Sequence, residues 1–569
     1  MWSGSVWMNG MNIRNGGKEN ADRLVAGVFS FLFAAALLFG RRLDSVENVD
    51  IRDWRLWVSI LVLTAVFSVL TPLLWRILDW IQIKGMSVRG RTSEKSVSNK
   101  ITNVLEWADR HAVLLSFFFL LLCWLPVFLA VYPGFFVYDA QDEYVQVASR
   151  TFSTHHPLVH VLLLGGMICG VHKLTDSYNL GIACYIILQM ILVAGGFAFL
   201  FWYLREKKIP RAVRLVCLVY LGLFPTVVMF TLCSAKDGMF TSALLLLLIC
   251  LLEMGKVEMF FVSKGWRILF VLSGMAMMLL RNNGFYAFLV MVPVLILLRK
   301  RQWRQVLFLA VCAVAGCLLV NGGLKTVLHA QSGEYQEILT VPIQQMARTY
   351  KYAPEVFTEK DREILHEVLS EEALSLYTPR LSDPVKYRFD NAAFAKDKAK
   401  YAGLWLRAGM KKPLVYLNAW WMTSYGFWYP DMVINVYGGN TVFTFTYKDS
   451  SYFGYEVEEP GVRESRIPWL DEVYRKLSLE VWKEKVPVVS WLFSPGAMFW
   501  LYAFLFTWLL HQRRYEIMYP FLPLFLLWLT VLLGPTYLPR YVLFLWYGLP
   551  LFLGMAVMET EGEAFAVKK

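Results

Sequence analysis

Three carboxylates lie close together in a short segment that follows an apolar run. Asp139, Asp142 and Glu143 come after a Pro-Gly pair and three aromatic residues. Carboxylates in this setting can take a proton from a hydroxyl group, bind a divalent cation such as Mg²⁺ or Mn²⁺, or simply be solvated. His155 and His156 follow, and imidazoles beside carboxylates can share a cation or hold a phosphate. The choice of base and the metal requirement stay open.

Cations stand at the ends of later apolar runs. Lys236 precedes one run, Arg281 separates two runs with almost no loop between them, and Arg540 begins the last. A charged side chain beside such a run commonly snorkels or forms a local ion pair. The alternative is that the three bind phosphate, for which arginine is the preferred planar partner. Their polar neighbours, which we expect to position these cations or the substrate, are Asp237, Asn282 and Asn283.

The composition indicates that lipid surrounds the elements carrying these residues. Of the 569 residues, 57% are hydrophobic and 18% are charged, whereas about a quarter is charged in ordinary soluble domains. The net charge of +12 comes from basic residues in short links between apolar runs. This pattern marks membrane topology and argues against nucleic acid as a partner. The eight cysteines lie in or beside apolar stretches, which argues against a disulfide framework and a thiolate metal site.

We predict an all-α polytopic membrane protein with about twelve spans, because each needs about 20 apolar residues. The runs are 24–40, 56–75, 112–132, 180–203, 213–231, 237–253, 266–280, 284–299, 305–325, 491–510, 516–534 and 538–558. A further stretch, 156–171, is interrupted by His160 and glycines, and whether it crosses stays open. If it lies along the surface or re-enters, nearly all basic links fall on the cytoplasmic side, together with both termini.

Four regions follow from this topology. They are a two-span N-terminal region (1–111), a transmembrane core (112–325) with a first large outer loop (133–179), a mainly helical extracytoplasmic domain (326–490) and a C-terminal three-span region (491–569). In the extracytoplasmic domain, Gln345 and Arg348 could face a substrate from one short helix, although domain packing is favoured for them. The stretch 430–455 is rich in Gly, Tyr and Asn and predicts turns or short strands.

These features resemble the membrane glycosyltransferases of the C-type (GT-C) fold, and more closely a group of uncharacterised bacterial multi-pass proteins related to them. The resemblance covers roughly 112–560. The motifs that carry it are Pro133-Gly134, Asp139, His156-Pro157, Lys236-Asp237, Arg281-Asn282-Asn283-Gly284 and Arg540-Tyr541.

The resemblance implies a polyprenyl-phosphate-linked sugar as donor and an acidic residue of the first outer loop as base. Asp139 matches that residue, with Asp142 and Glu143 as departures. We therefore expect an inverting glycosyltransferase that modifies a cell-envelope acceptor at the outer face of a bacterial plasma membrane. The alternatives are a carrier or flippase for an amphiphilic anion, and a glycan polymerase or ligase. The sequence contains no Walker loop, dinucleotide fingerprint, His-Glu-x-x-His or Gly-x-Ser-x-Gly motif.

Overall fold

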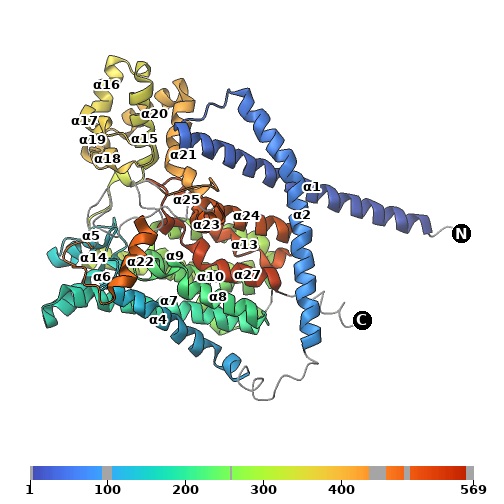
Figure 1. Cartoon of the computed structure of the whole chain (residues 1–569). Helices are drawn as coiled ribbons and strands as arrows, with labels where there is room; N and C mark the ends of the chain where they lie inside the picture. Colours follow the sequence, from blue (N-terminus) through green and yellow to red (C-terminus); the bar gives the residue numbers. More distant parts are fainter. Residues whose placement is uncertain (1–3, 93–105, 257–258, 435–456, 480–486, 559–569) are drawn as a thin grey trace.

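A computed structural model describes residues 4–92, 106–256, 259–434, 457–479 and 487–558. Within these ranges the chain is helical, with isolated β-bridges in place of strands. Figure 1 shows long helices lying side by side and a group of short helices, α15 to α20, at one end of them. The predicted all-α class is therefore confirmed. The segment 435–456, which includes most of the predicted turns or strands, lies outside the described residues.

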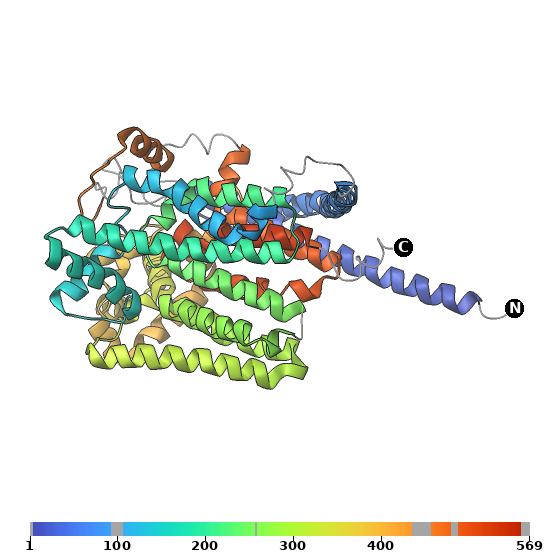
Figure 2. The ribbon, with the colours of Figure 1, turned by 90° about the horizontal axis from the view of Figure 1, so that it is seen from below.

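A bundle of apolar helices forms the larger part of the molecule. Its members are α4 (Ala112–Ala130), α7 (Tyr178–Glu206), α8 (Arg211–Leu223), α9 (Pro225–Thr231), α10 (Asp237–Lys256), α12 (Lys264–Leu280), α13 (Asn282–Leu298), α14 (Trp303–Val327), α24 (Pro495–His511), α25 (Phe521–Val531), α26 (Phe544–Tyr547) and α27 (Leu549–Val557). Packing contacts run from α4 to α7, α10, α12 and α14 in that order. Figure 2 shows α14 at one edge of this row. The middle helix, α10, is almost entirely buried.

The prediction of twelve spans is wrong. Seven helices of the described residues are long and apolar enough to cross a membrane, or eight if α8 and α9, which are bent by 56°, count as one span. Proline explains much of the difference, because it removes a backbone donor and breaks or bends a helix. The run 516–534 is α-helical over only Phe521–Val531, after Pro520. The run 538–558 is divided into η7 (Pro539–Val542), α26 and α27.

The loop after α4 folds into two helices at the end of the bundle nearest the short helices. They are α5 (Ala140–Ser149) and α6 (Leu158–Thr175). The 18 residues of α6 are long and apolar enough to cross a membrane. Its partner is the first part of α7, where Ile168 approaches Gly181 and His172 stacks on Tyr178. The first turns of α7 therefore hold α6 beside the segment that carries the carboxylates.

The N-terminal helices stand beside the bundle. α1 (Gly4–Val46) and α2 (Trp54–Thr92) pack on each other, and α1 also contacts α24. Figure 1 shows this pair crossing beside the C-terminal helices. Most of their apolar side chains are exposed, as expected for surfaces that lipid covers.

The short helices have a hydrophobic core of their own, and we call residues 335–411 the cap. They comprise η2 (Tyr335–Glu337), α15 (Thr340–Tyr352), η3 (Pro354–Val356), α16 (Glu359–His366), α17 (Glu371–Ser375), α18 (Asp383–Lys386), α19 (Asn391–Lys396) and α20 (Lys398–Lys411). The core lies among α15, α16, α17 and α20. The next helix, α21 (Pro413–Ser424), packs on α15 and links the cap to the bundle. The remaining described α-helices are α11 (Met259–Val262), α22 (Pro468–Leu479) and α23 (Pro487–Phe493).

Candidate functional site

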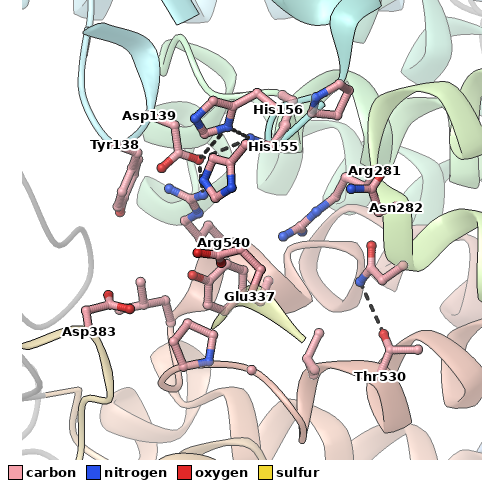
Figure 3. Close-up of a pocket in the computed structure, with 18 of the residues that line it drawn as sticks. Tyr138, Asp139, His155, His156, Arg281, Asn282, Glu337, Asp383, Thr530 and Arg540 are labelled. Atoms are coloured by element: carbon pink, nitrogen blue, oxygen red, sulfur yellow. Dashed lines mark hydrogen bonds and ion pairs between the residues drawn. The ribbon is translucent and has the colours of Figure 1, made fainter. Parts of the chain in front are cut away.

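A polar cavity of about 500 Å³ lies between the end of the bundle and the cap. Figure 3 shows side chains from both parts pointing into it. The bundle side of the cavity contributes residues from the loop before α5, from α5, from the link between α5 and α6, and from the ends of bundle segments: Tyr138, Asp139, Asp142, His155, His156, Lys236, Arg281, Asn282, Asn283, Arg540 and Tyr541. The cap contributes Glu337, Asp383, Lys386 and Tyr387. Most of the candidate residues predicted from the sequence therefore line one cavity.

Backbone hydrogen bonds join the loop of Asp139 to the turn that carries Lys236. Phe135 donates its backbone N–H to the carbonyl oxygen of Leu232 at 2.9 Å, and Ser234 donates back to Phe135 at 3.0 Å. Asp139 then stands at the N-terminus of α5, and Lys236 directly precedes α10. These two bonds bring a carboxylate and an ammonium group that are far apart in the sequence to the same point.

The ammonium group of Lys236 is the centre of the site. Its Nζ lies 3.0 Å from Oδ2 of Asp139, 3.4 Å from Oε1 of Glu143 and 3.3 Å from Nδ1 of His156. Arg540 donates from Nη2 to the same Oδ2 of Asp139 at 2.8 Å. The side chain of Lys236 is only 10% exposed. Two cations from distant parts of the chain thus share one oxygen of Asp139.

Asp237 joins the two arginines. Its Oδ1 lies 2.8 Å from Nη1 of Arg281, and its Oδ2 lies 3.3 Å from Nε of Arg540. The Asp237 side chain is 1% exposed, so it is a buried counter-ion for both guanidinium groups. Arg281 also lies against the rings of Phe240 and Tyr541. These contacts fix both arginines at the wall of the cavity.

A chain of buried polar groups extends from Glu143 away from the cavity. Its carboxylate hydrogen-bonds to Nδ1 of His160, whose Nε2 lies 2.6 Å from the Tyr185 hydroxyl. Tyr185 donates to Gln189 at 3.1 Å, and Gln189 donates to the carbonyl oxygen of Cys233 in the turn before Lys236. This network connects Glu143 in α5 to the turn before Lys236, and it holds Glu143 in place.

In the sequence, His160 is only an interruption of an apolar run, and Tyr185 and Gln189 lie inside another such run. One signal could have found the histidine. Glu143 follows Asp139 by four residues, and His160 follows His156 by four residues. A spacing of four places side chains on one face of a helix. In the structure, Glu143 and His156 both contact Lys236, and His160 contacts Glu143.

The surroundings of the cavity shift the pKa values of its two carboxyl groups in opposite directions. Burial acts to raise the pKa of Asp139, but the cations Arg540 and Lys236 outweigh it and hold that pKa well below the ordinary value. Asp142 is exposed, and partial desolvation and the negative charge of Asp139 raise its pKa. Burial and Lys236 lower the pKa of His156 to about 3, so this imidazole is neutral near pH 7.

The cap wall of the cavity was missed by the sequence analysis. Lys386 is buried and lies 3.1 Å from both Glu337 and Asp383. The ring of Tyr387 is exposed beside them. These residues follow no apolar run, and their spacing in the sequence predicts no shared site.

The structure places Gln345 and Arg348 away from the cavity. Gln345 accepts a hydrogen bond from Trp405 Nε1 at 2.8 Å. Arg348 is buried and donates to the Tyr377 hydroxyl at 2.9 Å and to the carbonyl oxygen of Glu47 at 2.7 Å. Both therefore serve packing of the cap, the reading that the sequence favoured. Of the predicted positioning residues in the cavity wall, Asn283 donates to the Thr530 hydroxyl at 3.2 Å, and His155 packs edge-on against His156.

The donor set fits a metal ion poorly. Among the described residues, no group of three or more His, Cys, Asp and Glu side chains has a geometry that could hold one. The carboxylates and the imidazole that converge near the cavity do so on Lys236, whose ammonium group already bridges Asp139, Glu143 and His156. No chemical step is therefore assigned to a divalent cation.

Comparison with protein families gives a match to a family of unknown function, DUF6020, over residues 143–568. This range covers about three quarters of the chain. The chain belongs to the DUF6020 family. The matched range contains Glu143, His156, Lys236, Arg281 and Arg540, whereas Asp139 and Asp142 precede it. Comparisons with curated proteins and with solved structures give no match.

Proposed function

We propose that this DUF6020 protein is an inverting glycosyltransferase that moves a sugar from a polyprenyl-phosphate-linked donor to a cell-envelope acceptor. The observation that supports this most is the convergence of Lys236, Arg281 and Arg540 with the carboxylate of Asp139 around one cavity. The cavity lies at the end of the apolar bundle, where a lipid headgroup can reach it. The cap covers that end and leaves room for an acceptor.

The reaction uses the two kinds of charge separately. An acceptor hydroxyl oxygen attacks the anomeric carbon of the sugar, and its proton passes to a carboxylate, for which Asp139 is the first candidate and Asp142 the second. The bond between the anomeric carbon and the phosphate oxygen breaks. The polyprenyl phosphate that leaves carries the electron pair, and Lys236, Arg281 and Arg540 stabilise its charge. A single displacement inverts the configuration at the anomeric carbon.

The position of the charges favours transfer over transport. A carrier for an amphiphilic anion needs polar groups along a path through the bundle. The charged residues that line the cavity lie at one end of the bundle, and α10 behind them runs through apolar residues from Met239 to Leu252 with only Thr241 and Ser242 as polar side chains. We therefore propose a reaction chamber at this end of the bundle, and the basic links of the sequence favour the outer side of a plasma membrane for it.

The test is transfer of radiolabelled sugar from polyprenyl phosphate by the purified protein in liposomes. Asp139→Asn and Asp142→Asn are compared with the unchanged protein. Loss of a general base lowers the rate by about a hundredfold or more, so the variant with that loss identifies the base. Absence of transfer by the unchanged protein on a panel of sugar donors would remove the proposal. Movement of the labelled lipid across the bilayer without transfer would point to a carrier instead.

A further inference from the structure

The carboxylates that neutralise the cations of the cavity differ in how firmly they are held. Lys236 has Asp139 and Glu143 as partners, and Arg540 has Asp139 and Asp237. The side chains of Glu143 and Asp237 are 2% and 1% exposed, whereas that of Asp139 is 35% exposed and lines the cavity. Glu143 is further held by His160, and Asp237 by two arginines. Asp139 is thus the partner with access to the cavity.

The cluster has no spare positive charge for an incoming anion. Lys236, Arg281 and Arg540 carry three positive charges, and Asp139, Glu143 and Asp237 carry three negative ones. An anion that enters a neutral, partly desolvated cluster loses hydration without a matching gain in ion pairing. Binding becomes favourable when one carboxylate gives up its ion pairs and the incoming anion pairs with the same cations. Exposure selects Asp139 for this role.

We propose that a phosphate group binds in this cavity by replacing the Asp139 carboxylate on Lys236 and Arg540. The inference rests on the proposed function, in which the phosphate belongs to the lipid-linked donor. Both cations now contact one oxygen, Oδ2, of Asp139. A tetrahedral phosphate offers several oxygens at similar spacing, and ammonium and guanidinium groups are its usual protein partners. Arg281 stands beside Arg540 on the other side of Asp237 and adds a third donor.

The exchange explains how a carboxylate so strongly paired becomes a base. While Lys236 and Arg540 hold Asp139, its pKa lies well below the ordinary value, which makes it a weak proton acceptor. When the phosphate takes both cations, Asp139 is released into the same cavity next to the bound donor. The base then exists only when the donor is present, and no covalent step is needed to switch it on.

The experiment measures binding of radiolabelled polyprenyl phosphate, and separately of inorganic phosphate, to the full-length protein in lipid nanodiscs. Asp139→Asn removes the competing carboxylate, so we expect both ligands to bind about tenfold more tightly, which corresponds to about 1.4 kcal/mol. Glu253→Gln is the matched control, because it removes the charge of another paired carboxylate, the partner of Lys207, which lies outside the cavity wall. It should change affinity by less than about threefold, because none of the cavity cations pairs with it.

Equal affinity in Asp139→Asn and the unchanged protein would overturn the exchange, as would an equal gain in Glu253→Gln. A gain for inorganic phosphate alone would overturn the assignment of the lipid donor as the occupant. Infrared difference spectra of the unchanged protein give a second measurement that needs no variant. Addition of phosphate should shift a carboxylate stretching band, and an unshifted band contradicts the exchange. Because binding is measured without sugar transfer, failure of the exchange and failure of the glycosyltransferase proposal give different results.

Discussion

The two ends of α10 each carry a buried carboxylate, and the two are used differently. Asp237 opens the helix and pairs with Arg281 and Arg540, which come from two other segments and line the cavity. Glu253, in the last turns of the helix, forms an ion pair with Lys207 and accepts from the Tyr203 hydroxyl at 2.7 Å. Both of those partners belong to one stretch around the end of α7. Glu253 lies outside the cavity wall.

Burial of a charged group is therefore not enough to mark a site. Glu253 pairs with Lys207 and Tyr203, which both lie at the end of α7. Contact between α10 and α7 is therefore enough to form both interactions. Asp237 pairs with Arg281 and Arg540, whose positive charges would otherwise repel each other, and both arginines line the cavity. Convergence of several segments on a cavity separates the second case from the first.

Asp237→Ala should destabilise the protein more than any other single change at the cavity. The change leaves Arg281 and Arg540 buried with one counter-ion fewer, and breaking a buried ion pair in this way costs about 3–5 kcal/mol. Unfolding of the purified protein in detergent should show this loss. Asp142→Ala, on the exposed rim of the same cavity, is the control. An unchanged unfolding midpoint in Asp237→Ala would mean that the arginines do not depend on Asp237.

The second prediction compares an arginine near the cavity end of α10, Arg281, with one near its other end, Arg299. Arg281→Lys keeps the charge but loses the planar donors, and we expect affinity for polyprenyl phosphate to fall about tenfold. Arg299 gives the matched control, because it donates to the carbonyl oxygens of Met254 and Gly255 at the other end of α10. Arg299→Lys should leave binding unchanged in the same assay. Equal losses in both variants would show that the effect is a general one on the bundle.

A third effect is the dependence of stability on pH at the cavity end. Burial and the charge of Lys236 lower the pKa of His156 to about 3. Burial acts to raise the pKa of Glu143, but His160 and Lys236 outweigh it and lower that pKa to about 2. In the unfolded chain these groups titrate near pH 6.5 and about 4.3. The unfolded state therefore takes up protons first, and stability is lost as the pH falls below about 6.5.

His156→Asn should flatten the upper part of this loss, between about pH 6.5 and 5. The unfolding temperature, measured over that range, tests it. His366→Asn, at an exposed position of the cap, is the control. A pH profile that is the same in His156→Asn and the unchanged protein would contradict the assignment.

The smallest effect should come from Glu253→Gln. The amide still accepts from Tyr203, and Lys207 is 24% exposed and can reach water. We expect a loss of about 1 kcal/mol or less in stability and unchanged phosphate binding. A loss as large as that of Asp237→Ala would make the two ends of α10 equivalent and would weaken the reading of the cavity end as a site.

Much of this site could be predicted because its members stand where apolar runs end. Lys236, Arg281 and Arg540 each mark such a boundary, and the pattern of basic links predicts that these boundaries lie on one side of the membrane. The structure brings them together with Asp139. The pairing itself could not be predicted, because Asp237 contacts Arg540 across about three hundred residues of sequence.

Other parts of the fold and the site could not be predicted from the sequence, for physical reasons. Hydropathy finds apolar residues but not the length of the helix that they form, so runs broken by Pro520 or Pro539 were counted as spans. A histidine in an apolar run, such as His160, looks like an interruption until its partners are known. The cap residues Asp383 and Lys386 belong to a short helix with no periodic pattern long enough to place it.

The sharing of Asp139 and Asp237 by Arg540 also has a consequence for biosynthesis. Arg540 is translated 401 residues after Asp139, which at about 5–20 residues per second corresponds to a delay of about 20–80 s. Until then, Asp237 has only Arg281 of its two arginine partners available. We therefore expect that the ion-pair cluster is completed only when the segment bearing Arg540 docks, and that a polypeptide truncated before that segment lacks one of the two cations of Asp139.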